Sequence, residues 1–181
     1  MAAKKSEDDI VLIHPEKLRA FVANLFKAAE LPENDAETVA HILVEADLRG
    51  VESHGVTRIR GYFQMMASGL INQYPSVAVL RETESTAMLD GDMGFGMVVA
   101  KQAMELALAK ARTAGIACVT ARNVTHTGMV GFYPMMAAER GMIGIAMNNG
   151  PAIVPPFGGK TPTLGTNPIS VAFPAGEEKP I

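Results

Sequence analysis

The stretch DGDMGFGMVVA, residues 90–100, decides between two classes of fold in which helices pack on a sheet. It follows an apolar run typical of a short strand (86–90) and precedes the Ala- and Met-rich pattern of a long helix (96–114). Gly94 and Gly96 form part of the glycine fingerprint of a dinucleotide-binding turn. Strand, glycine-rich turn and helix in this order are the local frame of a Rossmann fold.

The charged residues in and around this stretch argue against that interpretation. Asp90 and Asp92 would lie beside the pyrophosphate and repel it. Arg122 follows the next predicted strand (116–121), where the fingerprint needs an acidic side chain for a ribose hydroxyl. The pattern instead favours a tight turn with an acidic helix start, which the helix dipole stabilises. We therefore expect a sheet that is not of the Rossmann type.

The rest of the chain predicts helices first and mixed strands and helices afterwards. Apolar residues at helical spacing predict helices over 15–30, 32–49 and 55–68. In the second part, the expected strands are 77–82, 86–90, 116–121, 142–148 and 168–174, and the helices are 96–114 and 128–140. The predicted fold class is α/β (α+β): an N-terminal helical segment followed by a mixed, largely antiparallel sheet with helices. The change from helices alone to mixed strands and helices falls between the patterns at 55–68 and 77–82. We therefore predict one domain at 1–75 and another at 76–181.

Composition limits the classes of function. The chain has 181 residues, 48% apolar and 19% charged, with a net charge of −3, so a packed core is expected. No basic stripe is visible, so nucleic acid is not an expected partner. A single cysteine, Cys118, excludes an internal disulfide, and we expect no metal site. The first ten residues carry charge and no apolar stretch, and no run reaches the roughly 18 residues of a spanning helix. A cytoplasmic protein without a signal peptide or membrane contact is expected.

The stretch ESHGVTRIRGY, residues 52–62, places an imidazole beside a hydroxyl and two cations, between two apolar helical patterns. Histidine is a general acid/base near neutral pH, and the forked guanidinium of Arg58 suits a carboxylate. Ser53 is positioned to orient the imidazole of His54. The alternative is a helix start capped by Ser53, with solvated arginines and an incidental histidine. The first interpretation predicts a site for a small carboxylic acid.

Two further segments have the character of ligand loops. In RNVTHTGMVGFY (122–133), His126 lies between a predicted strand and a helix, whose free amides would favour a cofactor phosphate. The alternative is a helix cap at Thr125 or Thr127 with a nearby histidine. The Gly- and Pro-rich loop at 148–170 is longer than a plain connection needs, which favours a function, although a structural loop is also possible.

Four segments together resemble the malate/L-lactate dehydrogenase family that is unrelated to the Rossmann-type lactate dehydrogenases. They are EADLRGVESHGVTRIRGY, DGDMGFG, NVTHTGMVGFY and VPPFGGKTPTLGTNPISVAFP, within about residues 15–175. The resemblance implies an oxidoreductase with NAD or NADP as cofactor, acting on 2-hydroxy or 2-oxo acids or on cyclic 2-imino acids, as a homodimer. It makes 1–75 the substrate side and 76–181 a cofactor domain that is incomplete at its C-terminal end, so we expect this chain alone to be inactive.

The resemblance also implies roles for single residues. Ser53 and His54 belong to a proton relay, Arg58 holds the substrate carboxylate, and Thr166 lies near the substrate. His126 is an acid/base in some members; we expect His54 to be the proton donor and His126 to lie where nicotinamide and substrate meet. The residues implied for cofactor binding are His126, Thr127, Gly128, Met129, Val130, Gly131 and Asn149.

The sequence departs from the family pattern at Asn148-Asn149, where a Thr-Asn pair is usual, and in the Thr-Gly pair after His126. It is also about half as long as family chains. Two contrasting hypotheses are a non-catalytic remnant that binds a partner through a Met-rich surface, and a carboxylate-binding module without redox chemistry. The acid, and the choice between NAD and NADP, are left open by these residues.

Overall fold

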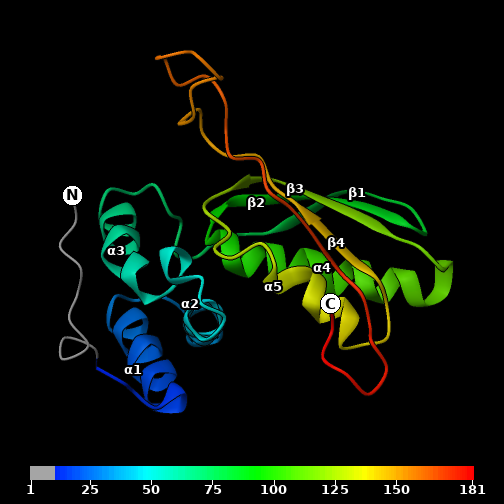
Figure 1. The fold of residues 1–181 in the computed structure, drawn as a ribbon, viewed down its shortest axis with the longest axis horizontal. Coiled ribbons are helices and arrows are strands. Elements are labelled where there is room, and N and C mark those ends of the chain that lie inside the picture. The colour runs from blue at the N-terminus through cyan, green and yellow to red at the C-terminus, as the bar shows by residue number, and fades with distance from the viewer. Residues whose placement is uncertain (1–10) are drawn as a thin grey trace.

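The computed structural model describes residues 11–181, and it places a group of helices beside a sheet layer (Figure 1). The helices are α1 (Pro15–Ala28), α2 (Glu33–Leu48) and α3 (Ile59–Ala67). The expectation about the first ten residues lies outside the described part. Within residues 11–181, no helix is both long and apolar enough to cross a membrane.

The predicted helix over 55–68 is shorter in the structure. Two 3-10 turns, Glu52–His54 and Val56–Arg58, come first, and α3 begins at Ile59. Gly55, with φ −89° and ψ −153°, separates the two turns. The carboxylate of Asp47 accepts the backbone N–H of Val56 at 3.0 Å and holds the chain in this path. His54 and Arg58 therefore belong to separate turns and do not share a helix face.

The sheet layer is mixed, as predicted. β1 (Ala78–Glu82) pairs antiparallel with β2 (Thr86–Gly94), and β2 pairs parallel with β3 (Cys118–Val124). The crossover between the parallel strands is α4 (Gly96–Ala114). A separate antiparallel pair contains β4 (Gly144–Met147) and β5 (Ile169–Ala172). The α/β class and the predominance of antiparallel pairing are confirmed.

Two element boundaries differ from the prediction in the region that carries His126. β3 continues to Val124, so Arg122 lies within the strand and not beyond its end. The predicted helix over 128–140 begins only at Phe132, as α5 (Phe132–Ala138). Gly128 adopts a φ of +68°, which glycine tolerates and which ends any helical path at that point. The residues between β3 and α5 are therefore an irregular loop.

The DGDMGFG stretch is neither a pyrophosphate turn nor an acidic helix start. Asp90 and Asp92 lie in β2, and the first turn of α4 contains no acidic residue. Asp90 accepts hydrogen bonds from Arg122 Nε at 3.0 Å and from Asn123 Nδ2. The prediction of an acidic helix start was wrong because the strand extends further than the apolar run.

Gly96 explains the glycine pattern in a different way. Its N–H donates to Thr125 Oγ1 at 3.0 Å, so the start of α4 lies directly on the segment that carries His126. A Cβ at Gly96 would lie 2.6 Å from the carbonyl oxygen of His126 and closer still to that of Thr125. Only glycine permits this approach of helix and loop without displacement.

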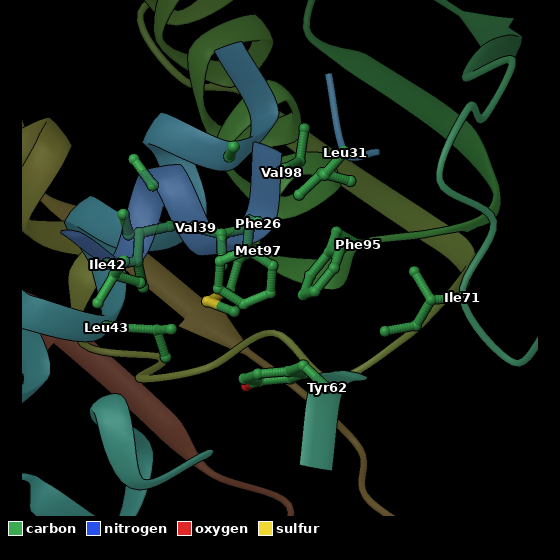
Figure 2. Packing of buried hydrophobic residues seen from close by; sticks show 14 of the residues in the cluster. Phe26, Leu31, Val39, Ile42, Leu43, Tyr62, Ile71, Phe95, Met97 and Val98 are labelled. Carbon is green, nitrogen blue, oxygen red and sulfur yellow. The ribbon is translucent and has the colours of Figure 1, made fainter. Parts of the chain in front are cut away.

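One apolar cluster joins the helices to the sheet layer (Figure 2). The Phe95 ring packs edge-on against Phe26 of α1, with ring centroids 5.6 Å apart, and it lies 5.3 Å from the ring of Tyr62. Met97 in the first turn of α4 is completely buried in the same cluster. This packing fixes α1 and α3 against the junction between β2 and α4.

The segment 149–168 extends away from the body as an arm (orange in Figure 1). Its base is closed by the N–H of Asn148, which donates to the carbonyl of Pro168 at 3.1 Å. Further out, Val154 and Leu164 form an isolated antiparallel bridge. Phe157 near the tip is completely exposed.

Candidate active site

Two histidines from distant parts of the chain meet at the junction of the helices and the sheet layer. The rings of His54 and His126 are stacked, with centroids 5.5 Å apart and an interplanar angle of 25°. His54 ends the first 3-10 turn, and His126 lies in the loop between β3 and α5. The structure thus brings together the two histidines that the sequence singled out separately.

His126 has a defined pattern of hydrogen bonds. Its Nδ1 lies 2.8 Å from the hydroxyl of Tyr62 and receives the backbone N–H of Gly128 at 3.2 Å. A backbone amide can only donate, so Nδ1 of the neutral ring has no proton. The Tyr62 hydroxyl must then donate as well, and the proton of neutral His126 is on Nε2.

Burial keeps His126 neutral. The surrounding apolar residues, and then the charges of His54 and Arg58, lower the pKa of His126 from 6.5 to about 4. Burial also raises the pKa of Tyr62 to about 12, against a smaller opposite effect of Arg58. At neutral pH the pair is therefore an uncharged phenol that donates to an uncharged imidazole.

His54 is more accessible and is oriented by its neighbour. Its Nδ1 lies 2.9 Å from the hydroxyl of Ser53. Ser53 makes no side-chain cap at either helix start, so the capping alternative is wrong. Partial burial and the positive charge of Arg58 both lower the pKa of His54. A histidine with a lowered pKa is unprotonated at neutral pH, so its free nitrogen is available as a general base.

Arg58 is the cation of the site. Its Nε donates to the backbone carbonyl of Ser53 at 2.6 Å, which ties the guanidinium to the turn that carries His54. Among residues 11–181, no carboxylate forms an ion pair with Arg58. The guanidinium keeps further N–H donors for a bidentate contact with a carboxylate.

The predicted cofactor residues divide into buried and accessible ones. Thr127, Gly128 and Met129 are buried. The Thr127 carbonyl accepts the buried hydroxyl of Tyr133, and its Oγ1 accepts Asn148 Nδ2 at 3.0 Å. These residues therefore hold the loop in place. Besides His126, the accessible residues of this segment are Val130 and Gly131, which are half-buried.

Thr166 and Asn149 lie at the base of the arm and are exposed. Neither makes a hydrogen bond with His54, His126 or Arg58 among the residues described. The connection is indirect, through the hydrogen bond between Asn148 and Thr127. The histidines and Arg58 thus form one cluster, and the arm residues lie apart from it in the chain as described.

Tyr62 and Asn148 are polar residues that sequence reasoning did not select. The signal for Tyr62 was its place four residues after Arg58, one helical turn further along.

Within residues 11–181, no group of three or more His, Cys, Asp or Glu residues is arranged to hold a metal ion.

Fold and site together define a mixed α/β protein whose stacked histidines and free arginine suit proton transfer next to a carboxylate. The chain belongs to the malate/L-lactate dehydrogenase family, whose model matches residues 13–181. A malate dehydrogenase from Pyrococcus abyssi is 48% identical over 168 residues, which are 93% of this chain and 46% of that protein. The ureidoglycolate dehydrogenase (NAD(+)) of Escherichia coli K12 is 36% identical over 92% of this chain and 48% of that protein.

The fold of these relatives is also known from solved structures. The malate dehydrogenase of Pyrococcus horikoshii OT3 superimposes with a TM-score of 0.91 and 44% identity, over 98% of this chain and 51% of that one. The chain thus spans about half the length of the relatives it matches.

Proposed function

We propose that this chain is part of an oxidoreductase that transfers a hydride between a nicotinamide cofactor, NAD or NADP, and a small 2-hydroxy or 2-oxo acid. The stacked pair of His54 and His126 beside Arg58 is the observation that carries this proposal. Malate and ureidoglycolate, the compounds in the names of two relatives, are both 2-hydroxy acids, and one of those names includes NAD(+).

Each residue of the cluster has a distinct task in this proposal. Arg58 binds the C1 carboxylate and so fixes the position of C2. During oxidation, the C2 hydroxyl gives its proton to His54, while the hydride on C2 leaves with its electron pair and a carbonyl forms. His126 donates its Nε2–H to the same oxygen and holds it in line. The reverse reaction uses the same groups, with protonated His54 as the acid.

A nicotinamide cofactor, when bound, accepts or supplies the hydride. The half-buried Val130 and Gly131 are the accessible part of the segment predicted to bind it. A Cβ added at Gly131 would have Ser170 Oγ as its nearest neighbour, at 3.7 Å, so the backbone there is open to a flat ring. The buried Thr127, Gly128 and Met129 would support this surface from below.

The test uses the full-length protein that contains this chain. Arg58→Ala should lower kcat/KM for 2-oxo acids by about ten- to a hundredfold, because a charge-assisted contact contributes about 1.5–3 kcal/mol. Cofactor affinity should be unchanged. Arg60→Ala is the matched control, since Arg60 is exposed and forms no ion pair among the described residues. An unchanged kcat/KM in Arg58→Ala would exclude the assigned role.

We also propose a role for each domain, an oligomeric state and a location. Residues 1–75 form the substrate side of the site and residues 76–181 the cofactor side, in a protein that is a cytoplasmic homodimer. Within residues 11–181, no carboxylate forms an ion pair with His54, whose Nδ1 lies 2.9 Å from the Ser53 hydroxyl. We propose that the half of the relatives' length that this chain lacks provides the remaining wall of the site.

A further inference from the structure

Tyr62 occupies two environments at once. Its ring belongs to the apolar cluster, at the border below Phe95 and Met97 (Figure 2), and only 3% of the residue is exposed. Its hydroxyl reaches out of that cluster to Nδ1 of His126, 2.8 Å away. A phenylalanine would serve the packing equally well, so the hydroxyl is the part of the side chain that packing does not explain.

The hydroxyl and the Gly128 amide act on the same nitrogen. Both donate to Nδ1, so the other tautomer and the imidazolium can form only if the Gly128 bond is lost and the Tyr62 hydroxyl turns from donor to acceptor. Among residues 11–181, no hydrogen bond involves Nε2 of His126. The N–H that remains free is therefore the one available to a bound molecule.

Stacking restricts the ring further. His54 lies against one face of the His126 imidazole, and the charge of Arg58 also acts on the ring. Together with Tyr62 these are the titratable groups that act on His126 from the turns and from α3. A half-turn of the imidazole about its Cβ–Cγ bond would keep the stack but would break the bonds of Nδ1 to Tyr62 and Gly128.

We propose that Tyr62 is a positioning residue, whose hydroxyl acts with the Gly128 amide to hold His126 as the Nε2–H tautomer and aims that N–H at the substrate oxygen. This inference rests on the proposed function for the role of Nε2–H, but the tautomer itself can be measured without any substrate. Tyr62 does not touch the substrate in this scheme and acts only through His126.

The experiment compares two matched variants of the full-length protein. Tyr62→Phe removes the hydroxyl on His126, and Tyr133→Phe removes another buried hydroxyl, which donates to the Thr127 carbonyl in the same loop. Nitrogen-15 spectra of labelled histidines report the tautomer and the titration of His126, with His126→Gln used to assign the signal. In the unaltered protein we expect a neutral Nε2–H ring down to a pH of about 4.

In Tyr62→Phe, the titration midpoint of His126 should rise by about half a unit to one unit, the equivalent of one neutral hydrogen bond. The kcat should fall about five- to tenfold with little change in KM, because Arg58 still holds the carboxylate. Tyr133→Phe should leave the tautomer and the titration midpoint of His126 unchanged. If Tyr62→Phe only loses thermal stability while the tautomer and the midpoint stay the same, Tyr62 is a packing residue and the proposal is overturned. An inactive unaltered protein would overturn the proposed function instead, and the spectra would still decide the role of Tyr62.

Discussion

Replacement of Gly96 by alanine tests how strictly the start of α4 positions His126. In an ordinary helix, glycine to alanine stabilises a protein by about 0.5–1 kcal/mol. At Gly96 the new Cβ would lie 2.6 Å from the His126 carbonyl oxygen, whereas real Cβ contacts are not found under 3.0 Å. Helix and loop must separate, which costs about 1–3 kcal/mol for overpacking. The lengthened bond from the Gly96 N–H to Thr125 adds up to about 1 kcal/mol.

The expected net result is a loss of about 1–3 kcal/mol in the free energy of unfolding. Gly61→Ala is the matched control, because Gly61 lies in α3 with nothing within 4 Å of a new Cβ. That variant should gain about 0.5–1 kcal/mol. Urea unfolding followed by circular dichroism measures both, and the midpoints should move in opposite directions.

Activity provides a second measurement for the same pair. A shift of about 1 Å in a group that contacts the substrate can lower the rate about 10²-fold, so Gly96→Ala should lose ten- to a hundredfold in kcat. Gly61→Ala should keep its activity. If both variants gain stability alike, the close contact between α4 and the His126 segment is absent in solution.

Three further predictions concern the histidines and the extent of the chain. Compared in parallel, His54→Ala should abolish the proton-transfer step with a loss of about 10²–10⁴-fold in kcat, and His126→Ala should retain more activity; the reverse order would exchange the two roles. The pKa of His126 falls from 6.5 in the unfolded chain to about 4 in the folded one, so the unfolded state binds the proton more readily between these values and stability should decrease as the pH falls through this window. Urea titrations from pH 7 to pH 4 should show a weaker decrease in His126→Gln, and equal slopes would contradict the assigned burial. Finally, residues 1–181 alone, titrated with NADH or NADPH and a panel of 2-oxo acids, should show no turnover, and ordinary dehydrogenase rates would mean that this chain holds the whole site.

Local patterns predicted the element types well, because apolar spacing reports directly on burial. The α/β class and the helix over 96–114 follow from that spacing alone. The start of α3 did not follow, because a carboxylate in α2, that of Asp47, holds the Val56 amide and imposes two 3-10 turns. The helix propensity of residues 55–68 does not report on that contact, because the contact depends on a residue outside the segment.

The site shows the same division. Ser53 beside His54 is a local arrangement, and adjacent residues in the sequence were enough to suggest it. The stacking of His54 on His126, and the bond from Tyr62, depend on how α3 packs against the loop after β3. Gly96 was selected for the wrong reason, since its missing side chain serves a helix-to-backbone contact that only the folded chain creates.

The base of the 149–168 arm is closed by a hydrogen bond, so a change in the length of the arm need not change the register between β4 and β5. Asn148 and Pro168 are already joined, and the pairing of Met147 with Ile169 starts directly beyond them. Once the ends of a loop are held, each doubling of its length costs only about 0.6 kcal/mol of closure entropy. Insertions or deletions beyond this clamp would leave β4 and β5 aligned. The arm is thus a modular unit, in which proteins of this fold can differ in length and reach while the histidine cluster stays the same.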